Sequence, residues 1–160
     1  MEKTYGAQSM TGRMTRVVLK RPADAFVSPE KIKREWQRLG FLAPPDLEKA
    51  SQEFSQLEEI LRQEGVEILY LPADERTTLD SIYTHDPVIV TEAGAIILQM
   101  GKKERAGEPE ALEEVLHGWG LPILGRLTGT ATAEGGDLLW LDEKTLIAGR
   151  SFRTNQEGIS

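Results

Sequence analysis

The order of apolar and polar residues along the chain predicts alternating strands and helices. Between Leu47 and Gly65, apolar residues recur at helical spacing with charged residues between them, as in an amphipathic helix. Asp46 can cap the start of this helix, and Gly65 is a typical stop. Similar patterns predict two more helices, over residues 29–39 and 108–119.

Short apolar runs bounded by proline, glycine or charged residues predict the strands. The expected strands are 16–19, 66–71, Ile82-Tyr83, 88–90, 95–98, 121–124, 138–141 and 145–148. The last two are expected to form a hairpin around Asp142-Glu143-Lys144. The order of two strands, a helix and a strand runs from residue 66 to 124 and begins again from 130, which indicates a repeated ββαβ unit.

Length and composition indicate one folded, acidic domain. A chain of 160 residues can bury a core, and 39% hydrophobic with 28% charged residues is typical of a folded protein. The net charge of −7 argues against a nucleic-acid-binding protein, which normally presents a basic surface. We expect residues 1–14 to form a flexible leader and residues 15–160 to form the domain.

The sequence also limits the location and the cofactors. No apolar run approaches the length of about 18 residues that spans a bilayer. Residues 1–14 lack the apolar core of a signal peptide, so we expect a cytoplasmic protein without membrane contact. The chain has no cysteine, and its only histidines, His85 and His117, lack the spacing of metal ligands. We therefore expect no metal and no cofactor.

Two carboxylates flank the predicted strand at Ile82-Tyr83. Asp80 and Asp86 are six residues apart, and an even spacing on a strand places both side chains on one face. Two carboxylates on one face can clamp a planar guanidinium with charge-assisted hydrogen bonds. The commoner use of such residues is structural, with Asp86 in a turn before Pro87 and His85 exposed.

A second charged region contains Glu134-Gly135-Gly136-Asp137. Its glycines permit close backbone approach, which can place Glu134 against a ligand, although a glycine turn into a strand is the commoner use. Arg105 and Arg153 can bind the anionic end of a ligand, and their ordinary alternative is a solvated loop charge.

Taken in order, these phrases resemble the guanidine-modifying superfamily of dimethylarginine dimethylaminohydrolases, arginine deiminases and amidinotransferases. The resemblance runs from about residue 15 to the last residue, and the phrases occur in the family's order with similar separations. The residues that carry it are Leu71-Pro72-Ala73-Asp74-Glu75, Asp80, His85-Asp86, Arg105, Glu134-Gly135-Gly136-Asp137 and Arg153-Thr154-Asn155-Gln156.

The resemblance implies an α/β fold and a reaction. The family fold is a five-bladed α/β propeller of ββαβ units around a central channel, and this chain would supply roughly three of the five. In the family, a cysteine attacks the guanidinium carbon to give a covalent thiouronium intermediate, which water or an amine resolves. A histidine serves as acid and base.

The resemblance also implies roles for individual residues. Glu134 matches the acidic member of the catalytic set, and Asp86 matches the residue that holds the guanidinium nitrogens. Asp80 would lie at the substrate, and Arg105 and Arg153 would bind its carboxylate.

Three family features have no firm counterpart in the sequence. The family's histidine lies past the Arg-Thr-Asn phrase and its cysteine lies near the C-terminus, and neither is present here. A loop leucine covers the substrate in the family, and Leu42 is assigned to this role. We therefore expect an N-terminal part of such an enzyme, without hydrolase activity of its own.

The sequence leaves the class of function open at two points. Hydrolase and amidinotransferase differ in whether water or an amine resolves the intermediate, and nothing in these residues decides between them. A non-catalytic binding module on the same propeller fold is the alternative outside enzymes. The expected partner is a small arginine-like guanidino compound, and a homodimer is one option for the full-length protein.

Overall fold

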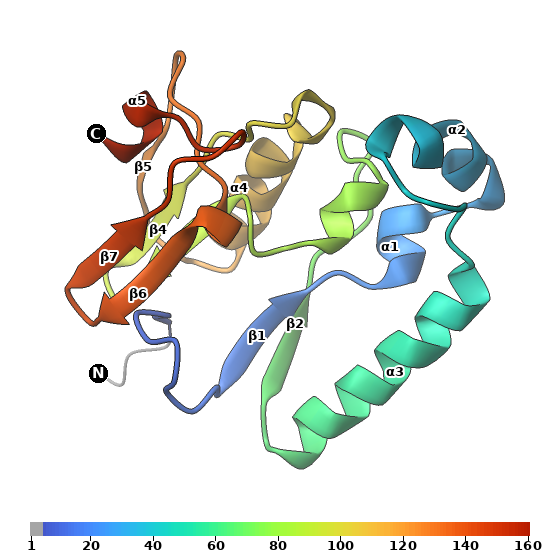
Figure 1. The fold of residues 1–160 in the computed structure, drawn as a ribbon. Helices are drawn as coiled ribbons and strands as arrows, with labels where there is room; N and C mark the ends of the chain where they lie inside the picture. The colour runs from blue at the N-terminus through green and yellow to red at the C-terminus, as the bar shows by residue number, and fades with distance from the viewer. Residues whose placement is uncertain (1–4) are drawn as a thin grey trace. The chain divides into compact units, whose positions relative to one another are not determined.

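The computed structural model describes residues 5–160, which form two compact units (Figure 1). The N-terminal unit is Arg13–Thr84, and the C-terminal unit is His85–Ser160 together with residues 5–12. Residues 1–4 of the predicted leader lie outside the described residues. The flexibility of residues 1–14 and a single domain over 15–160 stay predictions.

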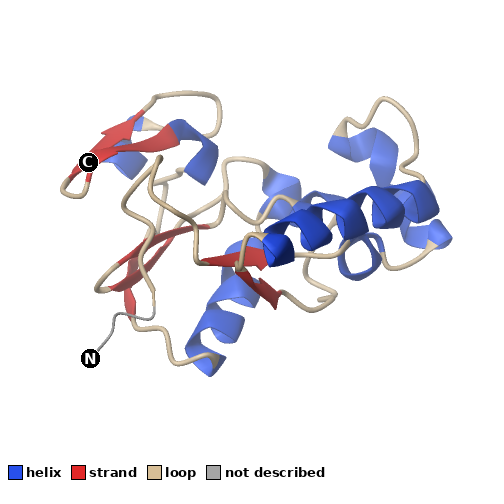
Figure 2. Cartoon of the chain, turned by 90° about the horizontal axis from the view of Figure 1, so that it is seen from below, coloured by secondary structure: helices blue, strands red, loops and turns tan. Residues whose placement is uncertain are grey.

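The N-terminal unit contains two parallel strands and the helices that connect them (Figure 1). Strand β1 (Arg16–Leu19) pairs with β2 (Glu67–Tyr70). Parallel strands need a long crossover, which is supplied by α1 (Pro22–Phe26), α2 (Pro29–Leu39) and α3 (Leu47–Gln63). Helix α3, with 17 residues, is the longest among the described residues (Figure 2). The helices predicted over 29–39 and from Leu47 are confirmed.

The helix ends follow the sequence signals. Ser28 caps α2 by accepting a hydrogen bond from the Lys31 N–H at 3.3 Å. Asp46 caps α3 by accepting one from the Lys49 N–H at 3.0 Å. Gly40 ends α2 with a φ of 88°, a left-handed conformation that favours glycine. These local contacts explain why both helix boundaries could be predicted.

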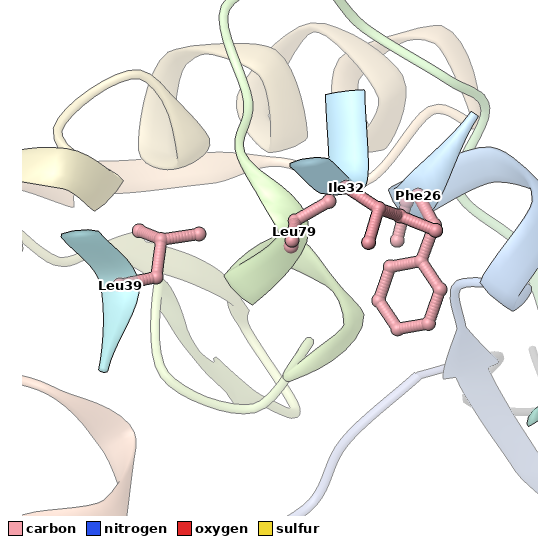
Figure 3. Packing of buried hydrophobic residues seen from close by; sticks show 5 residues of the cluster. Phe26, Ile32, Leu39 and Leu79 are labelled. Atoms are coloured by element: carbon pink, nitrogen blue, oxygen red, sulfur yellow. The ribbon is translucent and has the colours of Figure 1, made fainter. Parts of the chain in front are cut away.

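The core of this unit lies between α1, α2 and the short 3₁₀ helix η1 (Leu79–Ile82). Figure 3 shows the side chains of Phe26, Ile32 and Leu79 gathered together. Leu79 is fully buried, and its N–H donates to the buried Glu35 carboxylate at 3.2 Å. The start of η1 is thus fixed both by burial and by a hydrogen bond.

The strand predicted at Ile82-Tyr83 is wrong, because this stretch lies at the end of η1. The Ser81 hydroxyl donates to the Thr78 carbonyl at 2.8 Å, and this local bond favours the turn over an extended chain. Burial of Leu79 in the core favours the same turn.

The argument that placed Asp80 and Asp86 on one face of a strand therefore fails. Asp80 is part of η1 in the N-terminal unit, whereas Asp86 follows the boundary between the units. Any role that the two share has to rest on other grounds than strand periodicity.

The C-terminal unit contains one ββαβ sequence of elements. Its members are β3 (Val88–Thr91), β4 (Gly94–Ile97), α4 (Glu108–Gly118) and β5 (Ile123–Arg126), with the 3₁₀ helix η2 (Lys103–Arg105) before α4. The sheet has the order β3-β4-β5, antiparallel and then parallel. Strand β5 starts two residues later than the predicted start at Leu121, because Pro122 has no N–H and contributes only its carbonyl, to the Ala95 N–H.

The predicted hairpin is confirmed. Strand β6 (Leu138–Asp142) pairs with β7 (Thr145–Ala148), and the 3₁₀ helix η3 (Gly135–Asp137) precedes it. The short helix α5 (Gln156–Ile159) follows, and the Asn155 side chain caps it by accepting from the Gly158 N–H. The described leader residue Gln8 donates to the Glu143 carbonyl in the hairpin turn at 2.6 Å.

Candidate functional site

Four of the predicted site residues are joined by hydrogen bonds within the C-terminal unit. Asp86 accepts a hydrogen bond from Arg105 at 2.5 Å, and Glu134 accepts from Arg153 at 3.1 and 3.2 Å. The glycines after Glu134 join the two pairs, because the main chain of this segment is bonded to Asp86. The structure thus brings together residues that are up to 67 positions apart in the sequence.

The link between the pairs is a close contact of two main-chain segments. The Gly135 N–H donates to the Asp86 carbonyl at 2.9 Å, and the Gly136 N–H donates to Asp86 Oδ1 at 3.1 Å. A Cβ atom on Gly135 would lie 2.2 Å from the His85 carbonyl oxygen. Glycine is therefore required here by the close approach of the His85 main chain, and the turn also leads into β6.

His85 contacts the same glycine. Its Nε2 atom lies 3.0 Å from the Gly135 carbonyl oxygen, although the residue as a whole is exposed. The segment His85-Asp86 thus holds Gly135 by main-chain and side-chain contacts together.

Arg105 is a buried cation between two carboxylates. Its guanidinium donates to both oxygens of Glu108, at 2.9 and 2.7 Å, and to Asp86 Oδ2. Burial by itself lowers the pKa of Arg105, but the hydrogen bonds and charges of Glu108 and Asp86 outweigh it, so the pKa is raised above its ordinary value. Arg105 is therefore a fixed positive charge and not the solvated loop charge of the simpler interpretation.

Glu134 is held by main-chain donors. Its Oε1 atom accepts from the N–H groups of Gly101 and Lys102, both at 3.1 Å, and the side chain is buried. Arg153 reaches it from the segment after β7, with 40% of its side chain exposed. The carboxylate is thus fixed from one side, while the cation that contacts it is accessible.

Several residues that support these four were not predicted as site residues. They are Glu108, which accepts hydrogen bonds from Arg105, and the hydrogen-bonded group Asp137, Ser151 and Thr154. The Arg105–Glu108 pair could have been identified from the sequence, because opposite charges three positions apart at the start of a predicted helix can form an ion pair. No comparable sequence signal marks the hydroxyl groups, because their partners depend on the three-dimensional fold.

Asp80 and Leu42 belong to the N-terminal unit. Asp80 is buried in η1, and Leu42 is fully exposed in the segment between α2 and α3. Their assignment to the site stays a prediction.

Residues 5–160 contain neither a cluster of metal ligands nor a membrane-spanning helix. No group of three or more histidine, aspartate or glutamate side chains there is arranged to hold a metal ion. No helix among the same residues is long and apolar enough to cross a membrane.

The arrangement suits a ligand that carries both charges. The carboxylates of Asp86, Glu108, Glu134 and Asp137 outnumber the two guanidinium groups. Carboxylates with fixed orientation favour a planar cation, and an accessible arginine favours a carboxylate.

The chain is similar to known proteins of one family. The family described as "N,N dimethylarginine dimethylhydrolase, eukaryotic" matches residues 43–160. The N(G),N(G)-dimethylarginine dimethylaminohydrolase of Pseudomonas aeruginosa is 36% identical over 117 residues, which are 73% of this chain and 45% of that protein. The chain spans about half the length of the curated relatives that it matches.

Solved structures show the same similarity. A cysteine-to-serine mutant of the P. aeruginosa dimethylarginine dimethylaminohydrolase, in complex with citrulline, has a TM-score of 0.73 and 29% identity, over 92% of this chain and 54% of that one. An amidinotransferase from Microseira wollei has a TM-score of 0.63 at 15% identity, over 91% and 57% of the two chains, and is similar in fold alone.

Proposed function

Since the chain belongs to the dimethylarginine dimethylaminohydrolase family, we propose that it carries the guanidinium-binding residues of a hydrolase acting on arginine or a methylated arginine. The reaction would cleave a C–N bond of the guanidino group through a cysteine-linked intermediate. The sequence has no cysteine, so the nucleophile would come from outside these residues. The fold proposed for the whole protein is the five-bladed propeller of ββαβ units. The proposed location is the cytoplasm.

One observation carries the proposal: Asp86 and Glu134 each bind a guanidinium in this structure. Asp86 accepts from Arg105 and Glu134 accepts from Arg153, while main-chain N–H groups fix both carboxylates. Carboxylates held in this way keep their orientation when the cation changes. A guanidino ligand would therefore find acceptors that are already placed for its nitrogens.

Within this proposal, each residue has a separate role. Asp86 holds the guanidinium nitrogens of the substrate, and Glu134 is the acidic member of the catalytic set. Arg153 binds the substrate carboxylate from its accessible position. The buried Arg105 adds a second positive charge that attracts this carboxylate, and it also holds Asp86. Asp80 is proposed to lie at the substrate.

Leu42 is proposed to cover the bound substrate. Its side chain is fully exposed, and an exposed leucine on a connecting segment is available to close over an apolar part of a ligand. A homodimer of the full-length protein is a further part of the proposal.

Ligand titration of the 160-residue protein tests the guanidinium site. Citrulline and arginine should both bind in a calorimeter, and Asp86→Asn should weaken arginine about 10- to 100-fold, because it removes a charge-assisted hydrogen bond. The matched control is Asp142→Asn, since Asp142 also accepts from a main-chain N–H and a hydroxyl, but in the hairpin turn. Equal affinities of the two variants would contradict the assignment of Asp86.

The same samples test the proposed mechanism. The 160-residue protein should release no product from arginine or methylated arginines, with or without an added amine, because it has no thiol nucleophile. Turnover by this protein would contradict the proposed mechanism, and the need for an amine would identify a transferase.

A further inference from the structure

We infer that Asp137 is a positioning residue of this site. Through the hydroxyl groups of Ser151 and Thr154, it fixes the main chain of Arg153 relative to that of Glu134. The inference rests on the proposed function, in which Glu134 and Arg153 would bind opposite ends of the substrate. Asp137 would set the distance between these two residues. Asp137 itself would touch no substrate.

Thr154 provides the contact to Glu134. Its side chain is fully buried, and its hydroxyl donates to Asp137 Oδ2 at 2.6 Å. The hydroxyl oxygen of Thr154 also accepts a hydrogen bond from the Glu134 N–H at 3.2 Å. A carboxylate oxygen can only accept, so Asp137 forces the hydroxyl to donate and leaves its lone pair for Glu134.

Ser151 provides the contact to Arg153 in the same way. Its hydroxyl donates to Asp137 Oδ2 at 2.6 Å and accepts from the N–H groups of Arg153 at 2.9 Å and of Thr154 at 3.2 Å. One carboxylate oxygen thus orients two hydroxyls, and these hold three main-chain N–H groups. Two of these three N–H groups belong to Glu134 and Arg153, whose side chains also contact each other.

The opposite side of Arg153 leaves little room for adjustment. A Cβ atom on Gly101 would lie 2.5 Å from the Cα atom of Arg153, so the two main chains are in close contact. Gly101 also donates to the Glu134 carboxylate. The main chain of Arg153 is therefore enclosed between the loop at Gly101 and the hydroxyl network, and loss of the network would release it on one side.

The test compares arginine with agmatine, which is arginine without its carboxylate, by calorimetric titration of the 160-residue protein. The unaltered protein should prefer arginine. Asp137→Ala and Thr154→Val should lower the ratio of the two affinities about tenfold, because a displaced Arg153 no longer meets the carboxylate. Thr154→Ser, which keeps the hydroxyl, and Asp142→Ala, which removes a similar acceptor from the hairpin turn, should preserve the ratio.

A purely structural role would weaken both ligands alike and leave the ratio unchanged, and this result would overturn the inference while the proposed function stands. Loss of preference in Asp142→Ala or Thr154→Ser would overturn it as well. If the unaltered protein binds neither ligand, the proposed function fails and the inference fails with it. If it binds both equally, the proposed role of Arg153 fails, and the inference fails with that role while the guanidinium site stands. Should Asp137→Ala or Thr154→Val not fold, Ser151→Ala decides by the same ratio.

Discussion

At the scale of single residues, the buried contact between Arg105 and Glu108 determines how firmly Asp86 is held. The guanidinium uses two nitrogens for Glu108 and a third for Asp86. Because a guanidinium is not deprotonated in proteins, Arg105 keeps its charge when Glu108 is neutralised. Removal of one partner then leaves a buried charge without full compensation.

Glu108→Gln should therefore lower the free energy of unfolding by about 3 kcal/mol, measured by urea denaturation at neutral pH. Glu113→Gln is the control, because Glu113 pairs with Arg126, whose side chain is 58% exposed. Exposed pairs contribute about 0–1 kcal/mol. A loss of similar size in the two variants would show that burial of Arg105 does not carry the effect.

The sequence identified the charged members of the site but not the residues that hold them. Asp86, Arg105, Glu134 and Arg153 stand out because charged residues in short phrases with glycine suggest a site. Thr154 does not stand out, since its importance comes from complete burial and from partners 17 and 20 positions away. Such contacts are properties of the fold and have no local pattern.

At the scale of elements, the 3₁₀ helix η3 depends on a residue without a side chain. Gly135→Ala would bring a Cβ atom to 2.2 Å from the His85 carbonyl oxygen and push η3 away from Asp86. We expect a loss of about 3 kcal/mol in unfolding free energy, measured by urea denaturation, together with weaker binding of arginine. Gly118→Ala, in α4 with no atom within 4 Å of the added Cβ, should be neutral or stabilising. Equal stability of the two variants would contradict the close contact.

Elements with local signals were predicted well, and elements determined by packing were not. Helices α2 and α3 have caps and periodic apolar residues, and the β6–β7 hairpin has a polar turn. The sequence of Ile82-Tyr83 favours an extended chain, whereas burial of Leu79 and its hydrogen bond to Glu35 select the turn of η1. The start of β5 was misplaced for a simpler reason, which is the missing N–H of Pro122.

At the scale of the whole molecule, the family prediction is confirmed, although the chain matches only about half of the length of its curated relatives. The order of short phrases was sufficient, because each phrase combines residue types that the proposed chemistry needs. The arrangement of the two units and the closure of a propeller could not be derived in this way. They depend on contacts between segments far apart in the chain.

The β6–β7 hairpin exposes apolar side chains that a folded protein normally covers. Leu139 and Ile147 are cross-strand partners with 46% and 45% of their surfaces exposed, and Leu141 and Leu146 are exposed beside them. We expect the 160-residue protein to self-associate, with a mass that rises with concentration in light scattering.

The double variant Leu139→Thr with Ile147→Thr should reduce this association, because threonine keeps the preference for strands and removes apolar surface. Ile60→Gln, which removes one exposed apolar residue from α3, should leave it unchanged. A monomer mass for the unaltered protein at every concentration would contradict the prediction.

Arg153 already gives Glu134 the kind of group that an arginine-like substrate would bring. Under the proposed function, binding is then an exchange of one guanidinium for another rather than the addition of a cation to an anion. A ligand with a guanidinium alone replaces one ion pair by another and leaves Arg153 without its partner. A ligand that also carries a carboxylate restores a partner to Arg153, so the exchange itself selects for amino-acid-like substrates.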